Sequence, residues 1–461
     1  MPPNNRRSRA GASSATSGFH QTAPVMALLL LGLALPGNAH GQAAPKTAID
    51  SLVAVALGTN PTIRAAERRV DAARARIGPA GALPDPVLSL GIMNLPIVDP
   101  GFDDFMTMNT LGAGQRLPYP GKLSLARRAA ELELRAAEAR VRMARLEVEA
   151  GVRQAYYQMA FLNRSLEILE RNQELLVDFI GVTESRYGVG TGGQQDILKA
   201  RVETARLAEE AVSLAEARRA RLARLNALLD RPSETPIGAA RVPVRIARAA
   251  VPDDPDRIKF TSGELGGRAA DSPLPPLDVL QERAVIESPE VRTHEAEIAA
   301  QAARVDLARK AHLPDFDVSV QYGLRFDRTD MASVMVTVPI PVNRGARQDQ
   351  QVAEAEAELA AMQAGHHAMV NRIRADVAEA HSDLEEDRAR LALFARSIIP
   401  QGRAALESAT AAFQVGRADF LTLLENQTTL YDYEIAYFRA LTDFASGLAE
   451  LERIVGGEVL P

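Results

Sequence analysis

The feature that most constrains this chain is its long stretch without proline, from Gly121 to Arg231. The stretch is rich in alanine, leucine, glutamate and arginine, and the glycine cluster Gly188–Gly193 breaks it near its middle. It therefore predicts two long antiparallel helices joined at that cluster. A first helix from about Lys122 to Tyr187 would be roughly 100 Å long at about 1.5 Å per residue. No compact globular domain has room for such a helix.

The first of these helices carries a coiled-coil pattern. Its apolar side chains recur at steps of four and three residues, which is the heptad spacing of packed helices. Only Gln173 interrupts the series. The series comprises Val148, Val152, Ala155, Met159, Leu162, Leu166, Leu169, Leu176 and Ile180.

A second copy of the same layout lies in the second half of the chain, and an internal repeat is a safe guide to architecture. Asn60-Pro61 and Ser288-Pro289 each mark the start of a helix. The turn sequence Tyr187-Gly-Val-Gly190 has its counterpart in Phe413-Gln-Val-Gly416. We therefore predict a duplicated unit of helix, strand, strand and long helical hairpin, with Pro400 bending the second hairpin.

The predicted organisation has four parts. Residues 1–41 are a secretory signal peptide, because arginines precede an apolar run, Val25–Leu35, that is too short to span a bilayer. Proline, glycine and mixed charges predict an irregular linker between the repeats. The first repeat covers 42–231, with strands at about 86–95 and 104–117 and a helical hairpin at 121–231. The linker covers 232–276. The second repeat covers 277–457, with strands at about 316–326 and 331–341 and a helical hairpin at 345–455.

Charge and cysteine content exclude several kinds of partner and site. The chain has a formal net charge of -6, and loss of the signal peptide would remove arginines but no acid, so no nucleic-acid partner is expected. The chain contains no cysteine. This rules out disulfides, thiolate metal sites and a lipid-modified N-terminal cysteine.

The segments predicted as strands alternate apolar and polar side chains, which is the period of an amphipathic strand. The alternation is strict over Phe316–Phe326 and continues over Ala332–Ile340, whereas Phe105–Gln115 is less regular. These lengths approach the roughly 9 to 11 residues that a tilted strand needs to cross a bilayer. Alternation alone also fits a soluble sheet with one buried face. Four strands are too few to close a barrel, for which about eight is the lower limit, so a barrel would be shared between chains.

The chain resembles the TolC family of outer-membrane efflux proteins over nearly all of residues 47–457. The resemblance rests on the duplicated order and on the motifs Arg186-Tyr-Gly-Val-Gly190, Asp196-Ile-Leu198 and Val415–Glu425. Four further motifs are similar to the heavy-metal efflux branch typified by CzcC and CusC: Leu83–Val87, Asn94–Pro96, Met106–Met108 and Leu117–Lys122. Many relatives are lipoproteins, whereas this chain lacks the cysteine.

The resemblance implies a mostly α-helical fold in which three chains pool four strands each into a shared 12-stranded trimeric β-barrel, while their coiled-coil hairpins form an α-barrel tunnel. It implies an exit duct in the outer membrane of a Gram-negative bacterium, with a long periplasmic extension. The partners would be outer-membrane lipid, a periplasmic adaptor (membrane fusion) protein and an inner-membrane pump of the RND type. The cargo would be heavy-metal cations, either copper and silver or cobalt, zinc and cadmium; a drug or another small molecule is the alternative.

Two other classes of function fit less well. A periplasmic coiled-coil adaptor has one hairpin flanked by small β-domains, whereas this chain has two hairpins and two strand pairs. A secreted enzyme would need a nucleophile, a metal or a pair of acids, and no such constellation is present, so neither catalysis nor a cofactor is expected. Gly188-x-Gly-x-x-Gly193 matches a dinucleotide fingerprint only formally, because a helix precedes it where a strand is required.

The resemblance also assigns site residues. The hairpin turns would dock on the adaptor, and acids just after the second turn would form the pore constriction. Relatives carry acids six and nine positions after Gly416, where this chain has Thr422 and Glu425, and Asp419 lies one turn nearer the tip. The three fall on one face of a helix. The predicted docking residues are Val189, Gly190, Thr191, Val415, Gly416 and Arg417.

No metal site is predicted. His366 and His367 lack ligands at metal-binding spacing and are expected on a solvated helix surface. Methionine sulfur is a soft ligand for Cu(I) or Ag(I), but strand packing is the simpler interpretation of Met93, Met106 and Met108.

Overall fold

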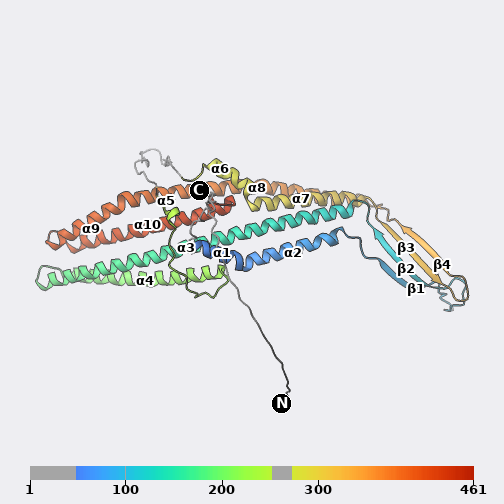
Figure 1. Ribbon diagram of the computed structural model, residues 1–461, viewed down its shortest axis with the longest axis horizontal. Helices are drawn as coiled ribbons and strands as arrows, with labels where there is room; N and C mark the ends of the chain where they lie inside the picture. The colour runs from blue at the N-terminus through green and yellow to red at the C-terminus, as the bar shows by residue number, and fades with distance from the viewer. Residues whose placement is uncertain (1–47, 99, 252–272, 461) are drawn as a thin grey trace, which may run out of the picture. The chain divides into compact units, whose positions relative to one another are not determined.

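The repeat that the sequence predicts is present in the structure (Figure 1). The computed structural model describes residues 48–98, 100–251 and 273–460, and the predicted signal peptide lies outside them. The first repeat comprises α1 (Ala48–Thr59), α2 (Pro61–Gly81), β1 (Val87–Met93), β2 (Met108–Leu117), α3 (Lys122–Gly188) and α4 (Gln194–Leu228). The second comprises α6 (Leu277–Glu287), α7 (Pro289–Arg309), β3 (Phe316–Leu324), β4 (Met331–Thr337), α8 (Gln348–Leu393), α9 (Ile399–Gln414) and α10 (Phe420–Val455). The predicted fold class, mostly helical with a small sheet, is confirmed.

Helix α3 runs unbroken for 67 residues, as the lack of proline predicts. The predicted heptad side chains form its packing seam, because all are buried except Leu166 and Ile180, which are half-buried. Leu176 shares a cluster with Leu207 of α4 and Tyr431 of α10. The seam therefore holds the two repeats together. Among the described residues, no helix is both long and apolar enough to cross a membrane.

The main hydrophobic core joins α1, α3, α6, α8 and α10 with part of the segment between the repeats. That segment is predicted to be irregular, but its described part contains the helix α5 (Val244–Ala250). Ile246 and Ala250 of α5 are buried in the core. A seven-residue helix spans only about two turns, too few for a 3.6-residue period to show in the sequence.

Helix α8 continues into α9 through a π-helical turn, Phe394–Ile398. Pro400 follows in the first turn of α9. Proline has no N–H to donate to the preceding turn and its ring crowds the carbonyl there, and a wider turn accommodates both effects. The first repeat has Glu174 at the corresponding place, and α3 stays regular. The predicted interruption of the second hairpin is confirmed.

The four strands form one antiparallel sheet in the order β1-β2-β3-β4. The pairing of β2 with β3, in which Leu117 lies opposite Phe316, joins the two repeats. Every residue of β1 and of β4 is exposed. Among the described residues of one chain, the outer edges of β1 and β4 have no strand partner, and such edges can accept further strands.

All four strands are shorter than predicted, and local features account for the ends of three of them. Strand β1 ends before Asn94, which has a positive φ of 56°. Strand β2 begins at Met108 because the Asp104 carboxylate accepts a hydrogen bond from the N–H of Met106 at 2.8 Å and folds this segment into a turn. Strand β4 ends ahead of Pro339, which cannot donate to a ladder.

Candidate functional site

The two helical hairpins end in turns of the same construction. In the first turn the N–H of Gly190 donates to the carbonyl oxygen of Tyr187 at 3.0 Å, and in the second the N–H of Gly416 donates to that of Phe413 at 3.1 Å. Both glycines have a positive φ, 78° at Gly190 and 74° at Gly416. Residues with a Cβ adopt this conformation only at a steric cost, so each turn needs its glycine.

The residues predicted to dock a partner all lie exposed on these turns. Val189 and Val415, just before the two glycines, are 73% and 68% exposed. Thr191 and Arg417, just after them, are also exposed. A Cβ placed on Gly190 would meet no atom within 4 Å. Both tips therefore present an apolar side chain and accessible main chain, with open space at Gly190 and the Arg186 guanidinium 3.7 Å from the place of a Cβ on Gly416.

Arg186 of α3 connects the tip of the first hairpin to that of the second. Its Nη1 donates to the carbonyl oxygen of Phe413 at 2.9 Å, and its guanidinium carbon lies 4.8 Å from the centre of the Phe413 ring. Phe413 is buried and packs edge-on against Phe420, the first residue of α10. This link is not predicted from the sequence, where Arg186 stands out only as the first residue of a turn motif.

The three residues predicted to form the pore constriction lie at the start of α10. The Asp419 carboxylate caps this helix, accepting a hydrogen bond from the N–H of Thr422 at 2.9 Å. Hydrogen bonds from Thr422 lower the pKa of Asp419 below its usual value, so the carboxylate stays ionised. Thr422 and Glu425 are exposed, whereas Phe420 and Leu423 on the other side of the helix are buried. The structure thus brings Asp419 and Thr422 together and leaves Glu425 accessible.

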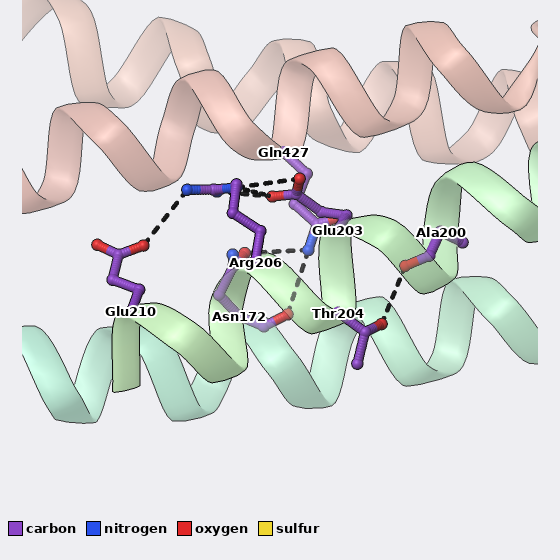
Figure 2. A network of polar contacts seen from close by, with 7 residues as sticks. All are labelled: Asn172, Ala200, Glu203, Thr204, Arg206, Glu210 and Gln427. Atoms are coloured by element: carbon purple, nitrogen blue, oxygen red, sulfur yellow. Dashed lines mark hydrogen bonds and ion pairs between the residues drawn. The ribbon is translucent and has the colours of Figure 1, made fainter. Parts of the chain in front are cut away.

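Further from the turns lies a network of polar contacts, one of which joins the two hairpins (Figure 2). The side-chain amide of Gln427 in α10 donates to the Asn172 side chain in α3 at 3.0 Å. On α4, Arg206 pairs with Glu203 at 2.6 Å and with Glu210 at 3.4 Å. The hydrogen bond to Glu203 raises the pKa of Arg206. Gln427 is buried, and its contact with Asn172 links the two repeats.

A cavity of about 500 Å³ lies beside this contact, between α3, α9 and α10. On its wall the buried Glu434 accepts hydrogen bonds from Arg171 of α3 and from Arg403 of α9, the latter at 2.8 Å. One carboxylate therefore bridges both hairpins. The cavity is lined by charged and amide groups together with apolar side chains such as Ile168 and Leu406.

The structure places the three methionines at one end of the sheet. Met93 and Met108 are cross-strand partners, and Met106 lies exposed in the turn before β2. Met108 is buried, and its sulfur occupies the space that a side chain at Gly323 of β3 would need. Met108 therefore packs within the sheet. Across 48–98, 100–251 and 273–460, no three histidines or acids lie where they could together hold a metal ion.

Comparison with known proteins finds one family over both repeats. The family described as outer membrane efflux protein matches residues 52–230 and 280–457. The chain is 24% identical over 426 residues to the cobalt-zinc-cadmium resistance protein CzcC of Cupriavidus metallidurans, covering 90% of this chain and 91% of the relative. It is also 24% identical over 453 residues to the pyoverdine export outer membrane protein OpmQ of Pseudomonas putida, covering 92% of this chain and 89% of the relative.

Solved structures share the fold. The outer-membrane channel OprN superposes with a TM-score of 0.73 at 20% identity, covering 90% of this chain and 91% of that one. CusC superposes with a TM-score of 0.72 at 17% identity, covering 89% and 92%. VceC of Vibrio cholerae gives 0.70 at 21% identity, covering 89% and 96%. The predicted resemblance is thereby confirmed.

Proposed function

The chain belongs to the outer membrane efflux protein family, a family of transport channels, and we propose that three copies of it form the exit duct of a tripartite heavy-metal efflux system. The proposal has three parts: the shared barrel, the docking of a periplasmic adaptor at the hairpin tips, and the cargo.

The observation that carries the proposal is the sheet with two unpaired edges. Strands β1 and β4 are exposed along their whole length, and large apolar side chains such as Leu90 and Val334 stand in solvent on them. Four strands cannot close, whereas three copies joined edge to edge supply twelve, within the range of known outer-membrane barrels. Closure would pair both edges and cover these side chains with lipid or protein.

The long hairpins support a tunnel that reaches away from the sheet. Helix α3 starts directly after β2 and, at about 1.5 Å per residue, carries its end roughly 100 Å from the sheet. The turns at that end are exposed and glycine-dependent in both repeats. We assign them as the docking surface for the hairpins of an adaptor that is itself bound to an inner-membrane pump of the RND type.

Heavy-metal cations are the proposed cargo. The support is the relative described as a cobalt-zinc-cadmium resistance protein, which aligns over nine-tenths of both chains. The relative described as a pyoverdine export protein has the same sequence identity to this chain, 24%, and it favours a small organic solute as the second candidate cargo. The same duct can serve either cargo, metal cations or a small organic solute, because a tunnel need not bind its cargo tightly.

Deleting the gene is expected to sensitise cells to at least one of copper, silver, zinc, cobalt and cadmium, since the cation would lose its route out of the periplasm. Growth on each salt, beside a panel of drugs, dyes and siderophores, measures this. The gene supplied on a plasmid should restore growth. Sensitivity to organic compounds alone would reassign the cargo, and no sensitivity at all would refute export of either class.

The exposed Glu425 is expected to set the cation preference of the duct. In a trimer it would form a ring of three carboxylates near the tips, and such rings attract cations. In planar bilayers, Glu425→Ala should lower the cation preference or raise the resting conductance. Glu209→Ala, at an exposed acid on α4, is the matched control and should change neither. If both properties of Glu425→Ala match the wild type, Glu425 does not line the constriction.

A further inference from the structure

Three histidines gather where α7 packs against α8. The ring of His294 on α7 lies nearly parallel to that of His366 on α8, at 20°, with the ring centres 5.9 Å apart. The His367 ring is tilted by 68° to that of His366, with centres 6.4 Å apart. His366 is half-buried beside α7, so the solvated surface predicted for this pair holds only for the exposed His367.

Two nitrogens of this cluster are buried without a partner. The Nδ1 atoms of His294 and His366 are out of contact with solvent, and neither has a hydrogen-bond partner among the described residues. The His294 ring lies over Gly365, with its Cε1 3.9 Å from the place of a Cβ there. Buried polar atoms are almost always satisfied, so two unpaired imidazole nitrogens in one small region require an explanation.

We propose that His294 and His366 bind one Cu(I) or Ag(I) ion through one ring nitrogen each. With metal–nitrogen bonds of about 2.0 Å, the length found at zinc, two imidazoles whose nitrogens point at one ion have ring centres roughly 5.5 to 6.3 Å apart, depending on the bond angle at the metal. The observed separation of 5.9 Å falls in this interval. Each imidazole would present a neutral nitrogen lone pair, which is the form that ligates metals.

The ligand set decides which metal fits. No third histidine or acid in the described ranges is placed to complete the site, whereas zinc sites need three or four ligands. Cu(I) and Ag(I) accept two ligands, and they also favour thioether sulfur. Met362 and Met369 lie four residues before and three after His366, hence on the same face of α8. This face of α8 therefore offers both nitrogen and sulfur donors.

The site deepens the proposed function, on which its biological meaning rests, because it would give the duct a contact for one pair of its candidate cargo cations. Binding itself can be tested apart from transport. The purified wild-type trimer in detergent is titrated with Ag(I) by isothermal calorimetry, and X-ray absorption at the silver edge reports the ligand atoms. We expect one site per chain with two nitrogen ligands.

Three variants make the test specific. His294→Gln and His366→Gln should each weaken Ag(I) binding at least tenfold, whereas His367→Gln, at the exposed neighbour, should change it less than twofold. Ag(I) binding should raise the Tm of the wild type. If either His294→Gln or His366→Gln assembles poorly, the loss of this rise in the one that assembles serves as the readout. Equal binding by the wild type and a His294→Gln/His366→Gln double variant, or an equal loss in His367→Gln, would overturn the site. Intact Ag(I) binding in a duct that confers no metal resistance would instead overturn the proposed cargo.

Discussion

Phenylalanine at both Gly190 and Gly416 is expected to abolish efflux while leaving the duct assembled in the outer membrane. Both glycines have a positive φ, so a side chain there strains the turn. A Cβ on Gly190 meets no atom of the chain, so the added ring would stand in the space proposed for the adaptor. Export should fall at least tenfold, to the level of the gene deletion, in growth assays on the metal salts.

Gly238→Phe controls for the bulk of the added ring, because Gly238 is not among the glycines with a positive φ. A Cβ on Gly238 also meets nothing within 4 Å, but the residue lies in the segment between the repeats, far along the chain from either turn. Its efflux should equal that of the wild type. Trimer content and membrane insertion of all variants are compared by native gel and fractionation. Wild-type resistance in the Gly190→Phe/Gly416→Phe variant would refute docking at these turns.

Asp387→Asn is expected to stabilise the folded chain at neutral and higher pH. Asp387 lies on α8 with its side chain 14% exposed. Burial, and then the neighbouring Asp443 carboxylate, raise its pKa to about 7. Ionising it in the folded chain therefore costs free energy that the unfolded chain, with a pKa of about 4, does not lose.

The sign of the effect follows from this difference. Folding favours the protonated carboxyl, so its contribution to stability is full below about pH 4 and is lost as the pH rises to about 7. At roughly 1.4 kcal/mol per pKa unit, the loss reaches up to about 4 kcal/mol per chain. The Tm of Asp387→Asn should therefore match the wild type near pH 4 and exceed it at pH 8. Asp178→Asn, at an exposed acid on α3, should show no such trend, and a pH-independent difference for Asp387→Asn would contradict the argument.

The fold was predictable from the sequence because its determinants are long and periodic. A run without proline specifies α3, a heptad specifies its buried seam, and strict alternation specifies β3. Each of these signals repeats over several turns or strand residues. Shorter signals do not: α5 is a single seven-residue helix, and the turn that delays β2 depends on one hydrogen bond from Met106 to Asp104.

The candidate site was predictable only in part. The two turns could be placed because their glycines recur at equivalent positions in the repeats. The link from Arg186 to Phe413 could not, because it joins residues 227 positions apart and ends on a main-chain oxygen, which any residue supplies. The pairing of His294 with His366 depends likewise on how α7 lies on α8. Such contacts follow from tertiary packing, which no local pattern records.

The two unpaired edges of the sheet have a kinetic consequence. In the proposed duct, β1 and β4 gain their missing partners only from neighbouring copies, so the sheet is completed by an encounter between chains rather than by the chain alone. Until it assembles, a newly exported copy exposes both unpaired strand edges, and these can pair with any extended polypeptide nearby. The rate of duct assembly would therefore depend on the concentration of secreted subunit. Periplasmic chaperones and proteases would act on the unassembled subunit rather than on the finished duct.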